Sequence, residues 1–144
     1  MNIKTIALIF LILASKYAYA CDCIKQTTTS QDFANSKFVI YGMVEKVEPD
    51  LSNTLYEGLL GNVRSLEIYK GSANSIKTVS GSAQNSAGLC MVKLEPGEYV
   101  LYSNNETTSV SSCSLSIKLS AITKEKKQLL LKSLRELREQ KIPK

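Results

Sequence analysis

The sequence pattern with the clearest chemical consequence is Cys21-Asp22-Cys23, which follows a segment typical of a secretory signal peptide. Cleavage after Ala20 would give Cys21 a free α-amino group, whose unperturbed pKa is about 8. That amine can lose its proton to a metal ion, and the Cys21 carbonyl lies within chelating reach of the same ion. If disulfides hold both cysteines rigid, this terminus is a preorganised bidentate ligand for a metal in another protein's active site.

The signal peptide is predicted from the order of charge, apolar run and small residues. Lys4 precedes the mostly apolar, uncharged run at 5–14, and Ala18 and Ala20 lie just before the expected cut. The run is too short to cross a bilayer, which takes about 20 apolar residues. We therefore predict a signal peptide at 1–20 and a single secreted or periplasmic domain at 21–144. The alternatives are a lipoprotein signal with an acylated Cys21, and a buried N-terminal helix.

Charge is distributed unevenly over the predicted domain. The full chain carries a net charge of +5, and removing Lys4 and Lys16 with the signal leaves +3. Residues 123–144 contain eight Lys or Arg and three Glu, a surplus of +5, so the rest of the domain carries −2. A slightly acidic body is a poor electrostatic match for nucleic acid, and we expect no nucleic-acid partner.

All four cysteines, Cys21, Cys23, Cys90 and Cys113, fall in the predicted exported part. An even number in an exported chain indicates two disulfides, with three pairings open. A Cys21–Cys23 bridge would be strained, so long-range pairings are favoured, each stabilising by about 4 kcal/mol in the chain-entropy model. A zinc site is the competing interpretation, but the spacing lacks the usual paired ligands.

The remaining chain indicates five strands followed by one helix. Alternation and apolar runs predict strands at 38–48, 62–71, 75–80, 98–103 and 110–115, whereas 51–61 and 81–88 have the composition of loops. Gly42 inside the first strand predicts a bulge or bend of the kind that curves small barrels. The sequence therefore predicts a small all-β or α+β domain.

The predicted helix spans 124–140 and is capped by Thr123. Its apolar face is predicted to contain five leucines: Leu129, Leu130, Leu131, Leu134 and Leu137. We expect this face to pack on the sheet. The alternative is a basic amphipathic helix that contacts anionic membranes or a partner, although Glu136 and Glu139 interrupt its positive face.

Several kinds of chemistry are excluded by what the sequence lacks. The chain has no histidine, which removes Ser-His-Asp and Cys-His catalysis and histidine-zinc sites. Phosphate-binding and nucleophile-elbow glycine motifs are absent too. We therefore expect neither an enzyme nor a cofactor. The tyrosines of the predicted strands, as at Tyr99 and Tyr102, are expected to pack in the core rather than stack on bases.

Beyond these patterns, several short segments resemble those of one protein family in order and spacing. They are Cys21-Asp22-Cys23, the segment 33–40, Ile68-Tyr69-Lys70-Gly71, the small-residue stretch 81–90, the strand 96–102 and Ser111-Ser112-Cys113-Ser114. Together they resemble the netrin-like domain of tissue inhibitors of metalloproteinases, and most closely the small bacterial members of that superfamily. The resemblance covers about residues 21–120.

The resemblance implies a five-stranded oligonucleotide-binding-type (OB-type) barrel with a flanking C-terminal helix, and disulfides Cys21–Cys90 and Cys23–Cys113. It also implies an inhibitor that chelates the zinc of a target metalloprotease through the Cys21 amine and carbonyl. In that arrangement Asp22 points into the specificity pocket, and Ala87, Gly88 and Leu89 belong to the adjoining ridge.

The sequence departs from the family at three points. Ala34 stands where the animal inhibitors have another cysteine, and their C-terminal domain is missing. Asp22 stands where they usually have Ser or Thr, and its carboxylate would face an often apolar pocket and the protease's catalytic glutamate. Because both effects weaken inhibition, the alternative function is a non-inhibitory module that binds another exported protein in the envelope or extracellular space.

Overall fold

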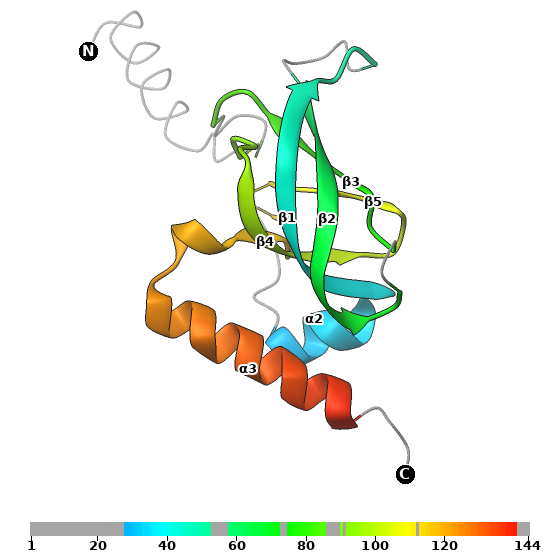
Figure 1. The fold of residues 1–144 in the computed structure, drawn as a ribbon, viewed down its shortest axis with the longest axis vertical. Helices are drawn as coiled ribbons and strands as arrows, with labels where there is room; N and C mark the ends of the chain where they lie inside the picture. Colours follow the sequence, from blue (N-terminus) through cyan, green and yellow to red (C-terminus); the bar gives the residue numbers. More distant parts are fainter. Residues whose placement is uncertain are drawn as a thin grey trace, which may run out of the picture.

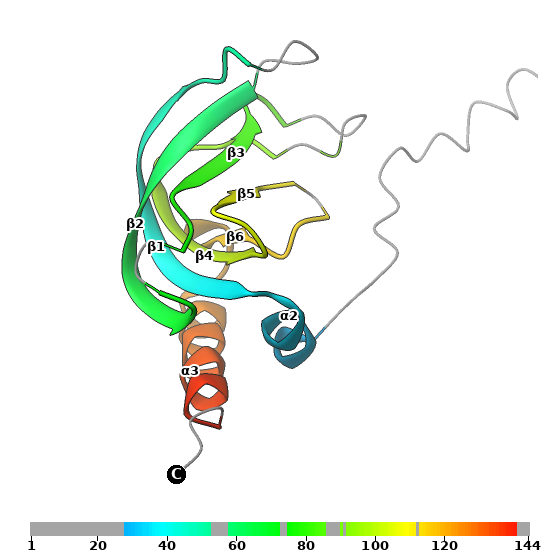
Figure 2. The ribbon, with the colours of Figure 1, turned by 90° about the vertical axis from the view of Figure 1, so that its right-hand side faces the viewer.

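The computed structural model describes residues 28–52, 58–72, 75–85, 90, 92–111 and 113–140. They form a mixed α+β fold, in which a strongly curled sheet carries two helices on its outside (Figures 1 and 2). The strands are β1 (Phe38–Pro49), β2 (Gly58–Lys70), β3 (Thr78–Ser82), β4 (Gly97–Ser103), β5 (Thr107–Ser109) and β6 (Ile117–Lys118). The helices are α2 (Thr29–Asn35), the 3-10 turn η3 (Leu119–Ala121) and α3 (Lys124–Gln140).

The sheet has the strand order β5-β3-β2-β1-β4-β6. Every neighbouring pair is antiparallel except β3 and β5, which run parallel, with Val79 opposite Thr108. The long strands β1 and β2 bend along their length and give the sheet the form of a half-barrel (Figure 2). The predicted bend at Gly42 is confirmed, because the β1–β2 register shifts between Tyr41 and Gly42.

Apolar side chains pack on both faces of this sheet, because residues alternate along each strand. On β4, Tyr99 and Leu101 face the inside of the curl, whereas Val100 and Tyr102 face the helices. The interior core contains Ile40, Val44, Ile76, Val79, Leu94, Tyr99, Leu101 and Val110. The helix-side core contains Phe33, Val39, Tyr69, Val100, Tyr102, Leu119, Leu131 and Leu134.

The C-terminal helix was predicted with the correct bounds. The Thr123 hydroxyl caps it by accepting from the Lys126 N–H at 3.3 Å. Leu131 and Leu134 are buried against the sheet and α2, with Leu130 and Leu137 half-buried beside them. The prediction for Leu129 is wrong, since this side chain is 64% exposed, on the far side of the apolar stripe.

Three predictions about the strands are corrected. The described sheet has six strands instead of five, because the predicted strand 110–115 is replaced by β5 before it and β6 after it. Its serines bond to nearby backbone, as when the Ser111 N–H donates to Ser114 Oγ at 3.1 Å, so the chain turns there. The predicted loop at 51–61 ends early because β2 begins at Gly58, and β3 begins at Thr78, three residues later than expected.

Gly61 lies in β2, although the segment 51–61 has the composition of a loop, and its close contacts explain why a glycine stands there. A Cβ at this position would lie 2.6 Å from Val44 Cγ1 of β1 and 3.2 Å from Val79 Cγ1 of β3. The absence of a side chain therefore lets β1, β2 and β3 curl tightly around the interior core.

Candidate functional site

The whole predicted inhibitory edge lies outside the described part of the chain. This holds for six residues: Cys21, Asp22, Cys23, Ala87, Gly88 and Leu89. The predicted signal peptide at 1–20 lies outside it as well. The roles predicted for these six residues and for the signal peptide stay predictions. The members of the predicted site that the structure describes are Cys90 and Cys113.

These two cysteines lie in loops. Cys90 is half-buried and has a φ of 55°, a conformation uncommon for residues other than glycine. Cys113 is exposed in the serine-rich turn, where its N–H donates to Ser111 Oγ at 3.3 Å. Neither is a free thiol. The pairing of the four cysteines stays a prediction, because Cys21 and Cys23 lie outside the described residues.

Hydrogen bonds fasten the chain beside each cysteine. After Cys90 the chain returns to the end of β3, where the Leu94 N–H donates to the Ser82 carbonyl at 2.9 Å. Around Cys113, the Ser114 N–H donates to the Ser111 carbonyl at 3.1 Å and closes the turn. The loop of Cys90 is thus anchored to β3, and the chain before the turn of Cys113 is anchored to β3 by the Val110 N–H, which donates to the Ser80 carbonyl at 2.9 Å.

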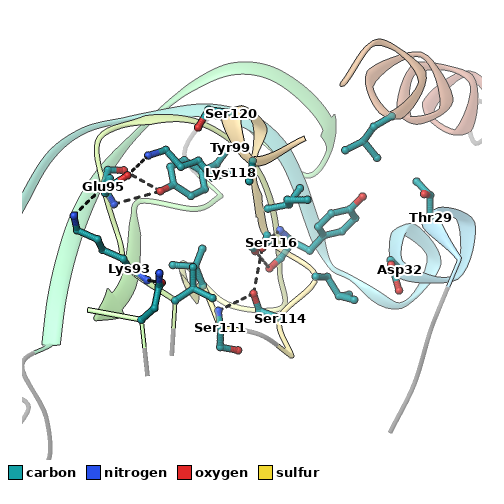
Figure 3. Close-up of a pocket in the computed structure, with 18 residues that line it drawn as sticks. Thr29, Asp32, Lys93, Glu95, Tyr99, Ser111, Ser114, Ser116, Lys118 and Ser120 are labelled. Carbon is teal, nitrogen blue, oxygen red and sulfur yellow. Dashed lines mark hydrogen bonds and ion pairs between the residues drawn. The ribbon is translucent and has the colours of Figure 1, made fainter. Parts of the chain in front are cut away.

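A cavity of about 690 Å³ lies between these loops and α2 (Figure 3). Its lining combines Thr29 and Asp32 of α2, Val92 after Cys90, and Ser111 and Ser114 on either side of Cys113. The cavity thus brings together the beginning of the described chain and the neighbours of both described cysteines. No motif in the sequence indicated it, because its walls come from segments far apart along the chain.

Apolar side chains form much of the cavity wall. They are Val92, Tyr99, Tyr102, Val110, Leu115, Ile117, Ala121 and Leu130. Val92 and Leu115 are partly exposed, at 36% and 39%, whereas Tyr99, Tyr102 and Val110 are buried. The wall therefore continues from both cores of the sheet and opens to solvent next to the cysteine-bearing loops.

One end of the cavity carries a charged triad (Figure 3). Glu95 accepts from Lys118 Nζ at 2.6 Å and lies 2.8 Å from Lys93 Nζ. The hydrogen bond from Lys118, and then that from Lys93, lowers the pKa of Glu95 to about 2. The Tyr99 hydroxyl donates to the Glu95 carbonyl at 2.9 Å. The triad carries one excess positive charge, with both ammonium groups sharing one carboxylate.

Asp32 of α2 lines a separate part of the cavity wall, on the far side of Ser116 from the triad (Figure 3). Its Oδ1 is buried without a hydrogen-bond partner, the one such side-chain atom found in the described residues. Burial, and then the nearby Asp32 charge, raises the pKa of the Tyr102 phenol. Sequence reasoning missed Asp32, although the capping box of Thr28 and Gln31 marks the helix that carries it.

The arrangement offers binding groups of two kinds, an apolar wall and separated charges. Between the ends, Ser116 Oγ is engaged with β4, since it accepts from the Tyr102 N–H at 3.1 Å.

Within the described ranges, no group of His, Cys, Asp and Glu side chains is suited to hold a metal ion. In the same ranges, no helix is long and apolar enough to cross a membrane. No known family model matches the chain, and no curated protein is similar to it.

Proposed function

We propose that this chain is an exported netrin-like domain that binds a partner protein through the edge formed by Cys21, Asp22, Cys23 and residues 87–89. The proposed partner is a zinc metalloprotease, which the domain inhibits through the Cys21 amine and carbonyl. The proposed fold is an OB-type barrel of five strands, β1 to β5, to which β6 is added. The antiparallel β1–β2–β3 and β1–β4 pairs and the curled sheet support that description.

The observation that carries the proposal is the meeting of three chain segments at the cavity. Thr29, Val92 and Ser114 line it together, and they follow Cys23, Cys90 and Cys113 along the chain by a few residues. An extended chain covers about 3.3–3.6 Å per residue, so the six residues from Cys23 to Thr29 span up to about 20 Å. That reach allows Cys21 and Cys23 to approach the two loops, as the proposed Cys21–Cys90 and Cys23–Cys113 bridges require.

Two long-range bridges would fix the N-terminus before it meets its target. The Cys21 amine, deprotonated, and the Cys21 carbonyl would then occupy two positions on the target's zinc without further ordering of the chain. Asp22 would enter the neighbouring pocket, and Ala87, Gly88 and Leu89 would contact the enzyme beside it. The metal belongs to the target, and this chain supplies ligands in trans.

The test is inhibition of a panel of zinc metalloproteases by the oxidised chain beginning at Cys21. The matched control carries one additional alanine before Cys21, which removes the chelating amine and preserves the remaining surface. Inhibition that the extension abolishes supports the proposal. Equal inhibition by both forms contradicts the role of the amine, and no inhibition at concentrations far above those of the enzymes contradicts the inhibitory function.

Asp22 favours a second candidate function, a non-inhibitory module that binds an exported protein. A carboxylate in an apolar pocket is costly to desolvate, and the protease's catalytic glutamate would repel it. Asp22→Thr separates the two candidates. A gain of inhibition in this variant would show that the edge is built for a protease and that Asp22 restricts its targets, whereas continued inactivity favours the module.

A further inference from the structure

We propose that the cavity between α2 and the β4–β6 edge binds a small amphipathic cation. Its ammonium group would lie at Asp32, and its apolar body would lie along Tyr102, Val110 and Ile117. This site uses none of the residues of the proposed inhibitory edge, and it does not depend on the proposed disulfide pairing.

The size and lining of the cavity fit a small molecule. Its volume of about 690 Å³ falls within the roughly 300–1,000 Å³ typical of ligand sites, which are mostly apolar with a few placed polar groups. The wall between the two charged ends consists largely of apolar side chains, with Val92 and Leu115 at the exposed rim. A molecule with an aliphatic body would therefore exchange water contacts for apolar ones along most of its length.

The unpartnered oxygen of Asp32 determines which head group fits. A buried acceptor without a donor is destabilising, and more so when it is charged. No donor among the described residues bonds to Asp32 Oδ1. Rotation about χ2, which is broad for carboxylates, would turn either oxygen toward a ligand. A ligand ammonium would supply both the missing donor and the opposite charge.

The charges at the other end do not provide an equivalent site for an anion. Lys93 and Lys118 already share Glu95, at 2.8 Å and 2.6 Å. An anionic head group would have to compete with that carboxylate, whereas a cationic one at Asp32 displaces no ion pair found among the described residues. The cavity should therefore prefer a cation over an anion with the same apolar body.

The test is titration of the oxidised chain beginning at Cys21 with octylammonium and, separately, with octanoate, followed by amide NMR. We expect saturable octylammonium binding that shifts the signals of α2 and β4, with octanoate at least about tenfold weaker. Asp32→Asn should weaken octylammonium binding about tenfold or more, as expected for loss of a charged hydrogen bond. Asp50→Asn is the matched control, because the Asp50 carboxylate lies in the β1–β2 loop, where it accepts from Ser52, and outside the cavity lining, and this variant should bind as the parent does.

A second variant tests whether the ligand occupies the cavity and leaves the charge of the chain unchanged. Leu115→Trp enlarges a partly exposed rim residue and should reduce octylammonium binding while the fold is retained. Equal binding of octanoate, or binding unaffected by Asp32→Asn, would overturn the proposal, as would an absence of saturable binding. Lys25 precedes Asp32 by seven residues in the sequence. Octylammonium binding seen only after Lys25→Ala would also overturn the proposal, because the chain's own lysine would then be the occupant.

Discussion

The two faces of the curled sheet are stabilised in different ways. The interior core joins strands to strands, and its buried residues are apolar apart from the Tyr99 hydroxyl, which is bonded to the Glu95 carbonyl. The helix-side core joins the sheet to α2 and α3, and paired charges border it. The strands around the interior core are joined by backbone hydrogen bonds, whereas α3 is held on the outer face of the sheet by side-chain contacts.

Two carboxylates connect α3 to the sheet. Glu67 accepts from Arg135 Nη2 at 2.8 Å and from the Tyr69 hydroxyl at 3.0 Å, and Arg138 lies 3.5 Å away. Glu98 accepts from the Tyr41 hydroxyl at 2.6 Å and is also paired with Lys127.

Each carboxylate thus bonds both a strand tyrosine and a basic residue of the helix. Three of the eight Lys and Arg at 123–144 are therefore paired with carboxylates of the sheet: Lys127, Arg135 and Arg138. This weakens the interpretation of α3 as a basic surface for anionic membranes.

The largest effects are expected from removing a leucine on either face. Leu101→Ala in the interior and Leu134→Ala on the helix side should each cost about 2–5 kcal/mol of unfolding free energy, because both side chains are fully buried. Hydrogen exchange distinguishes the faces. Leu134→Ala should release α3 first while β1–β3 stay protected, whereas Leu101→Ala should weaken all strands together.

Leu129→Ala, at a 64% exposed position of the same helix, is the control and should leave stability nearly unchanged. Simultaneous loss of protection in strands and helix after Leu134→Ala would show that the two faces form one cooperative unit. That result would contradict the distinction drawn between them.

Removing one connecting carboxylate should have an intermediate effect. Glu67→Gln is expected to cost about 1–2 kcal/mol, because a partly buried carboxylate then loses charge-assisted bonds from arginine and the paired tyrosine loses its acceptor. Urea denaturation measures the loss. Glu136→Gln, in an exposed pair with Lys132 at 3.9 Å, should show no measurable change. Equal effects of the two substitutions would mean that Glu67 is only a surface charge.

The smallest expected effect is a difference in acid sensitivity between the faces. Hydrogen bonds from Arg135 and Lys127 lower the pKa values of Glu67 and Glu98 from the ordinary range of glutamate. A carboxyl whose folded pKa is depressed stabilises the fold above its unfolded pKa, and this contribution is lost as the pH falls through the folded pKa.

Thermal unfolding between pH 6 and pH 2 should therefore show a shallower decline in the Glu67→Gln, Glu98→Gln double variant than in the parent. Leu101→Ala should lower the midpoint at every pH but keep the parent slope. Part of the slope should remain in the double variant, because the pKa of Glu95 is lowered to about 2 as well. An unchanged slope in the double variant would contradict the role assigned to the two carboxylates.

The sequence predicted those elements whose signals are local and repeated. Helix α3 was predictable because its leucines recur at helical spacing after the Thr123 cap, and β1 and β4 were predictable from their apolar runs. Strands β5 and β6 have three and two residues, too few to show alternation. Serine side chains in the intervening turn satisfy backbone groups that a strand would otherwise pair.

The candidate site was predictable only in part. Cys90 and Cys113 could be selected by residue type, because cysteines in an exported chain are expected to pair. The cavity could not, since it depends on Asp32, Glu95 and Ser116 being brought together by the curl of the sheet. A buried carboxylate oxygen without a partner is a property of the packed chain, and no sequence spacing marks it.

The parallel pairing of β3 with β5 has a consequence for how the chain folds. Thr78 lies opposite Thr107, and Val39 of β1 lies opposite Tyr102 of β4, so the sheet is completed by contacts between residues distant in the sequence. Folds dominated by such contacts reach the native state in about milliseconds to seconds, because loop entropy is lost before the contacts form. We expect the apolar segment Tyr99–Tyr102 to be exposed until β1 and β4 pair, and to favour aggregation of the incompletely folded chain.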